Sequence, residues 1–184
     1  MPTALRYAEN GGEMRVTMRS RAELIAEYLL GDSGVRQQLV DEFENHHAEE
    51  VIDILIRGIL DKREDVYVRL SILQSLPFRE DSAPLRGRVA NALCKILLRE
   101  DDPLIRQHAG LALRAFVECP AVLDVLEAFV QNLSEEVRIR ENALAAIEFT
   151  AYGSAECRDR LNRLVDHPEF GQSIRDLLTR IVNK

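Results

Sequence analysis

The sequence predicts an all-α protein in which one pair of helices is repeated five times. The main observation is an arginine that recurs every 33 to 37 residues, as Arg36, Arg69, Arg106, Arg140 and Arg175. A period of this length is typical of stacked helical repeats. Aromatic residues make up only 5% of the chain, tryptophan is absent, and 46% of the residues are hydrophobic. This composition favours aliphatic helix packing over a β-sandwich.

Apolar residues stand at three fixed positions around each arginine: one before it, three after it and seven after it. Offsets of four residues place these positions on one face of a helix. All fifteen are apolar in a chain that is less than half hydrophobic. We therefore predict that the core contains Val35, Leu39, Phe43, Val68, Ile72, Leu76, Ile105, Ala109, Leu113, Ile139, Ala143, Ile147, Ile174, Leu178 and Val182.

The chain divides into an N-terminal arm and one repeat domain. Residues 1–19 contain Pro2 and the run Asn10-Gly11-Gly12, so they are predicted to form a flexible arm. Residues 20–184 form a single domain. The repeats are predicted at about residues 20–46, 47–78, 82–117, 119–150 and 154–183.

Local signals support each repeat in turn. The first begins with Ser20 and Glu23 in the spacing of a capping box, and the second begins with a strongly apolar helix over residues 51–60. The third follows a linker, residues 77–84, whose two prolines account for the longest interval. The fourth starts after Pro120. The fifth is the most polar, as expected of a repeat that ends a stack.

An acidic residue stands four positions before the arginine in four of the repeats, as Asp32, Asp65, Asp102 and Glu136. The simplest interpretation is helix capping, because aspartate is a favoured N-cap residue. The arginine that follows lies at the unfavourable end of the helix dipole and needs compensation. We therefore expect a ladder in which each arginine bonds the acidic residue and turn carbonyls of its own or the adjacent repeat. The alternative is a column of arginines that binds phosphates.

Two of these repeats resemble a known family. The segment 102–113 has the form Asp-x-x-Ile-Arg-x-x-Ala-x-x-Ala-Leu, and residues 136–147 follow it with glutamate in place of aspartate. This pattern is similar to the short bacterial variety of the HEAT repeat, and the resemblance covers about residues 20–183. It implies a right-handed, armadillo-like α-solenoid whose second helices line a concave surface. It also implies a protein that binds other macromolecules.

The composition disfavours several classes of protein. The net charge of −7 disfavours a surface devoted to nucleic acid, because such surfaces neutralise phosphates with basic residues. The cysteines Cys94, Cys119 and Cys157 are far apart and suggest neither a disulfide framework nor a zinc site. The sequence shows no membrane span or secretory signal, so a cytoplasmic protein is expected.

The sequence also offers no recognisable catalytic motif. It lacks the glycine-rich phosphate loops and the nucleophile elbow of common enzymes. His46 and His47 lie among acidic residues, but at a position where one helix should end and the next begin, so a solvated turn is favoured over a metal site. We therefore expect no enzyme activity, no catalytic residues, no cofactor and no metal.

The expected function is protein–protein interaction or scaffolding through the concave surface. Polar residues of the second helices should line this surface: Gln38, Asp41, Ser71, Gln74, His108, Glu141, Asn142 and Glu148. Their mixed to acidic character favours a protein or peptide partner with basic groups over nucleic acid or membrane. The resemblance leaves two alternatives open, an accessory subunit of an enzyme or chromophore lyase, and a nucleic-acid-binding HEAT module.

Overall fold

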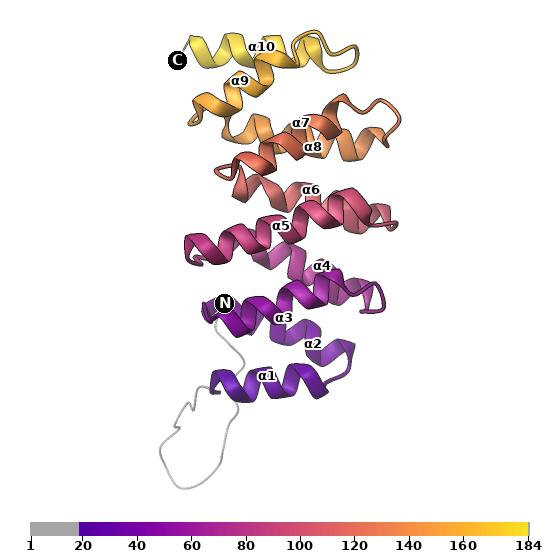
Figure 1. The fold of residues 1–184 in the computed structure, drawn as a ribbon, viewed down its shortest axis with the longest axis vertical. Helices are drawn as coiled ribbons and strands as arrows, with labels where there is room; N and C mark the ends of the chain where they lie inside the picture. Colours follow the sequence, from indigo (N-terminus) through magenta and orange to yellow (C-terminus); the bar gives the residue numbers. More distant parts are fainter. Residues whose placement is uncertain (1–18, 184) are drawn as a thin grey trace, which may run out of the picture.

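The computed structural model describes residues 19–183, which form ten α-helices and no strand (Figure 1). The prediction of an all-α protein is confirmed for this part of the chain, and residues 1–18 of the expected arm lie outside it. The helices are α1 (Arg21–Leu30), α2 (Ser33–Glu42), α3 (Glu49–Leu60), α4 (Val66–Ser75), α5 (Ala83–Arg99), α6 (Pro103–Leu113), α7 (Pro120–Gln131), α8 (Val137–Ala151), α9 (Ala155–Arg163) and α10 (Gly171–Val182). Short 3-10 turns, η1 (Phe43–Asn45), η2 (Leu76–Phe78) and η3 (Arg114–Phe116), extend α2, α4 and α6.

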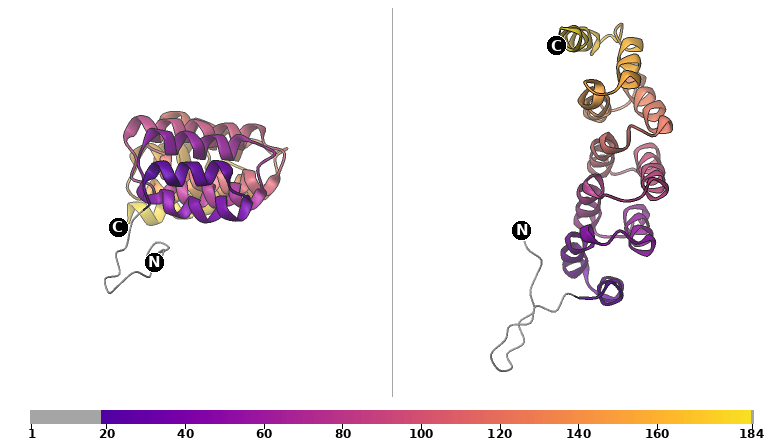
Figure 2. Two further views of the ribbon diagram at one scale, coloured as in Figure 1. Left: turned by 90° about the horizontal axis from the view of Figure 1, so that it is seen from below. Right: turned by 90° about the vertical axis from the view of Figure 1, so that its left-hand side faces the viewer.

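The helices are arranged in two layers. Odd-numbered helices form one layer and even-numbered helices the other, so the chain crosses between layers at every turn (Figure 2). The two helices of each pair pack against each other. Within the layers, α2, α4, α6 and α8 pack in series, as do α3, α5, α7 and α9. Helices α1 and α10 consequently lie at opposite ends of the stack (Figure 1). None of the helices in residues 19–183 combines the length and hydrophobicity that a membrane span needs.

Side-chain caps fix the starts of several helices. Ser20 and Glu23 form the predicted capping box at the start of α1. The Oδ1 atom of Asp32 accepts a hydrogen bond from the amide of Val35 at 3.0 Å, and Asp65 and Asp102 accept from first-turn amides of α4 and α6. An aspartate at this position satisfies amides that have no partner within the helix. The aspartate column therefore sets where the first three even-numbered helices begin.

The core runs between the two layers and follows the predicted columns. Twelve of the fifteen predicted core residues are buried, and Val35 and Leu178 are partly buried against them. The prediction is wrong for Val182, which is 83% exposed. Val182 lies in the last turn of α10, and no other helix within residues 19–183 covers it.

Four of the recurring arginines connect successive helix pairs. Arg36 on α2 donates to the carbonyl oxygen of Gly31 at 2.7 Å and to Glu64 at 3.0 Å. The other three also bond a main-chain carbonyl and a glutamate in the turn before the even-numbered helix of the next pair. The carbonyls belong to Ile59 and Leu97, near the ends of α3 and α5, and to Glu135 in the turn before α8. The pairs are Arg36–Glu64, Arg69–Glu100, Arg106–Glu135 and Arg140–Glu169.

The acidic partners differ from those that the sequence suggested. Asp32, Asp65 and Asp102 cap their own helices, and Glu136 makes no side-chain cap. The bonded glutamates precede these residues by one or two positions, and their longer side chains reach the preceding repeat. Glu64, Glu100 and Glu135 also accept a hydrogen bond from the amide of the residue that follows each, at 2.9 Å in all three turns. Each of these three glutamates therefore joins its own turn to the repeat before it.

The arginine of the last repeat has no such partner among the described residues. Arg175 donates to the carbonyl oxygen of Val165 and, at 3.2 Å, to Gln172, and it is exposed. The pair in the middle of the stack is the most enclosed, with side-chain exposures of 5% for Arg69 and 6% for Glu100. Arg69 and Arg175 can therefore be compared directly: Arg69 forms a buried ion pair with the next repeat, whereas Arg175 is exposed.

We predict that Arg69→Met destabilises the protein by about 3 to 5 kcal/mol, because it leaves the carboxylate of Glu100 buried without its cation. The matched variant Arg175→Met should change the free energy of unfolding by less than about 0.5 kcal/mol, since its side chain is exposed. Urea unfolding followed by circular dichroism measures both. Equal effects of the two substitutions would contradict a stabilising role for the bridge.

The pH dependence of stability provides a second test. Burial acts to raise the pKa of Glu100, but hydrogen bonds from Arg69 and from the amides of Asp101 and Asp102 lower it below the ordinary value. A lowered pKa in the folded state means that the unfolded chain binds the proton more readily, so stability falls as the pH decreases below about 4.3. We expect the unfolding free energy of Glu100→Gln to change less with pH between 5 and 3 than that of the wild type. Parallel profiles would be the contrary result.

Candidate functional site

The predicted recognition residues all lie on the layer of even-numbered helices. Gln38, Asp41, Gln74 and Glu141 are exposed, and Ser71, His108, Asn142 and Glu148 are half-buried. They come from α2, α4, α6 and α8, which are neighbours in that layer. We call the solvent-exposed side of α2, α4, α6, α8 and α10 the even-helix face. The eight residues are therefore brought to one face, although they are spread along most of its length.

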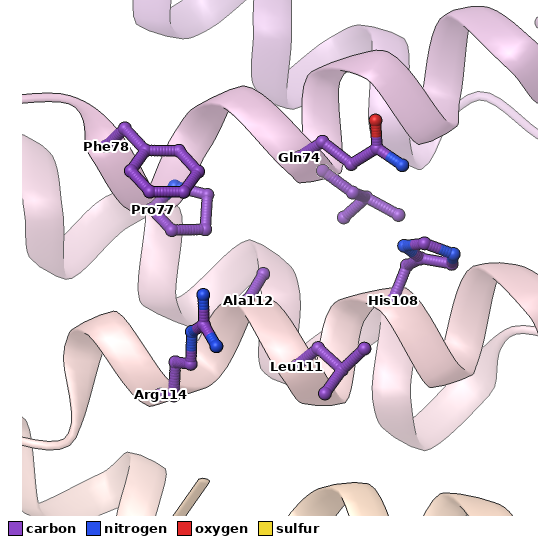
Figure 3. Close-up of a pocket in the computed structure, with 8 residues that line it drawn as sticks. Gln74, Pro77, Phe78, His108, Leu111, Ala112 and Arg114 are labelled. Carbon is purple, nitrogen blue, oxygen red and sulfur yellow. The ribbon is translucent and has the colours of Figure 1, made fainter. Parts of the chain in front are cut away.

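One pocket on this face lies between α4 and α6 (Figure 3). It has a volume of about 180 Å³ and is lined by Leu73, Gln74, Pro77, Phe78, His108, Leu111, Ala112 and Arg114. At one end the side chain of His108 points toward Gln74. At the other, Arg114 points toward Pro77 and Phe78. The pocket thus has an apolar middle and polar groups at its two ends.

A second pocket, which we call the α8–α10 pocket, is larger and more open. Its volume is about 570 Å³, and its lining residues are Glu141, Leu144, Ala145, Glu148, Phe149, Tyr152, Phe170, Ser173, Leu177 and Arg180. Two carboxylates and three aromatic rings contribute to its wall. Glu141 and Glu148 are seven residues apart, which places them on the same side of α8. The sequence predicted both glutamates as recognition residues. The pocket places them beside three aromatic rings that the sequence did not predict.

Exposed aromatic residues line both pockets. Phe78 is 66% exposed, Phe149 is 69% exposed and Tyr152 is 47% exposed. The described residues contain one other exposed aromatic side chain, Tyr67. Phe78 and Phe149 each stand nine residues after the arginine of their repeat, so column alignment contains a signal that could have identified them. Large apolar side chains gathered on a surface are typical of interaction sites.

Arg114 links the two pockets. Its side chain lines the first pocket, and its guanidinium group lies 5.4 Å from the ring centroid of Phe149, which lines the second. This distance is within the range of a cation–π contact. Within residues 19–183, no carboxylate lies at ion-pair distance from Arg114, unlike the ladder arginines. Its guanidinium donors therefore remain available to a ligand.

Glu148 is the most unusual carboxylate of the face. It is half-buried, and no hydrogen bond to it is found in the described part of the chain. Burial raises its pKa above the ordinary value, and the charge of Arg180 counteracts that shift in part. Glu100 and Glu135 show the opposite behaviour, since their bonds to arginines outweigh burial and lower their pKa values. Glu148 thus loses hydration on folding without gaining a partner in compensation.

The residues considered for metal binding or nucleophilic chemistry lie elsewhere. His47 approaches Asp81 with 3.3 Å between its Nδ1 atom and the Oδ1 atom, and Asp81 is paired with Arg79. In the described residues, no group of three or more histidine, cysteine, aspartate or glutamate side chains could hold a metal ion. Cys94 is a buried free thiol, and burial, with a smaller contribution from Cys119, raises its pKa to about 11. The even-helix face itself presents ring, guanidinium and carboxylate groups.

Comparison with models of known protein families and with the sequences of curated proteins finds no match for this chain.

We predict that Glu148→Gln stabilises the protein at neutral pH. A raised pKa in the folded state lowers stability as the pH rises through that pKa, because the unfolded chain releases the proton more readily. The amide does not ionise, so the variant should have a higher urea midpoint at pH 7, and this advantage should shrink as the pH falls through the raised pKa and be absent below about pH 4. Glu141→Gln, an exposed carboxylate on the same helix, is the matched control and should leave the midpoint unchanged. A lower midpoint for Glu148→Gln would contradict this account, because it would mean that the carboxylate stabilises the folded chain.

Proposed function

We propose that the chain is a HEAT-like α-solenoid that binds a protein partner across its even-helix face without catalysing a reaction. The recurring arginine, the five helix pairs and the two-layered packing support a repeat architecture. In such a stack the second helices of the pairs form an extended surface, and here these are the even-numbered helices. The same surface carries both pockets and most of the exposed aromatic residues.

The observation that carries this proposal is the exposure of Phe78 and Phe149 beside Arg114. Aromatic residues and arginine are enriched at the energetic centres of protein interfaces, where they supply large contact areas and several hydrogen-bond donors. A folded monomer gains little from exposing two phenyl rings to water. A partner that covers both rings would bury apolar surface that this chain leaves exposed.

A protein partner is favoured over nucleic acid because the recurring arginines are already bonded. Arg36, Arg69, Arg106 and Arg140 each pair with a glutamate of the next repeat, and these ion pairs neutralise the positive charge that phosphates would need. The even-helix face itself carries carboxylates such as Asp41 and Glu141, which would repel a phosphate backbone. This charge distribution supports a partner that brings basic groups.

The proposal predicts which surface a partner needs. The immobilised full-length chain is incubated with an extract of the cells that produce it, in parallel with the variants Arg114→Glu/Phe149→Ser and Lys95→Glu/Leu98→Ser. The second variant makes matched changes at exposed positions of α5, in the other layer. A protein retained by the wild type and by the α5 variant should be reduced at least about tenfold with the Arg114/Phe149 variant, since loss of one interface centre costs about 2 kcal/mol or more.

Two results would contradict the proposed binding surface. One is a partner that the Arg114/Phe149 variant retains as well as the wild type does. The other is a partner that only the α5 variant loses, which would place the interface on the odd-numbered helices. Circular dichroism of both variants before the experiment establishes that each remains folded.

A further inference from the structure

We infer that the α8–α10 pocket receives a lysine or arginine side chain from an extended segment of the partner protein. This inference rests on the proposed function and specifies the chemistry of the partner. It is based on the carboxylates and aromatic rings that line the pocket, and on the contact that one of these rings already makes within the chain.

The pocket combines the two kinds of group that bind a cationic side chain. Glu148 contributes a half-buried carboxylate without a hydrogen-bond donor in the described chain, and Glu141 contributes an exposed one. The rings of Phe149 and Tyr152 supply π faces, which attract ammonium and guanidinium groups. A basic side chain in this position would pair with Glu148 and restore the interaction that the carboxylate loses with water.

The contact between Arg114 and Phe149 shows that this ring can lie beside a guanidinium group, and a basic ligand would share the ring with Arg114. Their separation of 5.4 Å is similar to that of Arg86 and Phe116, at 4.7 Å, elsewhere in the chain. The pocket volume of about 570 Å³ leaves room for a long side chain and part of the backbone that carries it. An extended segment could then continue over Arg114 toward the smaller pocket between α4 and α6.

One residue that lines the pocket, Arg180, carries a positive charge that would repel a basic ligand. The inference therefore predicts opposite effects for removal of this charge and for removal of the charge on Glu148. Arg180 on α10 lines the pocket, and its Nε atom is directed to the carbonyl oxygen of Asp176 at 3.3 Å. Among the described residues, Arg180 forms no ion pair with Glu148 or Glu141, although its charge reaches Glu148. Replacement of Arg180 by a neutral residue should therefore strengthen the binding of a basic side chain, whereas neutralisation of Glu148 should weaken it.

The experiment uses a phage-displayed library of random twelve-residue peptides, selected on the immobilised full-length chain. Enriched peptides are synthesised, and their affinities are measured by fluorescence anisotropy with the wild type and with Glu148→Gln, Arg180→Gln and Glu50→Gln. Glu50 is an exposed carboxylate on α3 and provides the matched control. We expect enriched peptides to share a lysine or arginine, to bind Glu148→Gln about tenfold more weakly and Arg180→Gln more tightly, and to bind Glu50→Gln unchanged.

The outcomes separate this inference from the proposed function. Peptides without a shared basic residue, or peptides whose affinity is the same with Glu148→Gln, would overturn the inference. Enrichment of no peptide would also overturn it, because the inferred ligand is a linear segment. In each of these cases, loss of partner capture by the Arg114/Phe149 variant would still support the even-helix face as the interface. Because Glu148→Gln is expected to be more stable than the wild type, weaker binding by this variant could not be attributed to unfolding.

Discussion

The inter-repeat bond between an arginine and a glutamate is the interaction on which the stacking of the helix pairs depends. Apolar packing alone would allow neighbouring pairs to slide, because its energy depends little on direction. The bond from Arg69 to Glu100, with both side chains almost fully buried, requires one position of α4 relative to the turn before α6. Three similar bonds fix the other junctions. The ladder thereby holds the even-numbered helices as one surface.

A surface held in this way can leave some of its own groups unpaired. The described chain provides glutamates for four arginines of the ladder but no carboxylate for Arg114, and it leaves Glu148 without a donor. Unpaired polar groups beside exposed rings cost stability, and proteins retain such costs where recognition requires them. Under the proposed function, a scaffold arginine such as Arg69 has a carboxylate partner in the described chain, whereas the recognition arginine Arg114 has none.

The sequence predicted more of the fold than of the site, for physical reasons. Helix periodicity and repeat spacing are local properties, so most of the residues in the apolar columns do lie in the core. The ladder glutamates were missed because they stand five or six residues before the next arginine, whereas the aspartates stand at a constant four. The pockets depend on how neighbouring helices are spaced, and a single sequence does not specify this distance. Phe78 and Phe149 occupy the same position relative to the recurring arginine, but only these two of the five repeats have an aromatic residue there.

The most direct test of this account is amide hydrogen exchange of the full-length chain, measured with and without the captured partner. Binding across the even-helix face should slow exchange in η2, η3 and the last turns of α8, next to Phe78, Arg114 and Phe149. Exchange in the odd-numbered helices should remain nearly unchanged. Protection confined to α3, α5 and α7 would contradict the account, because it would place the partner on the opposite layer.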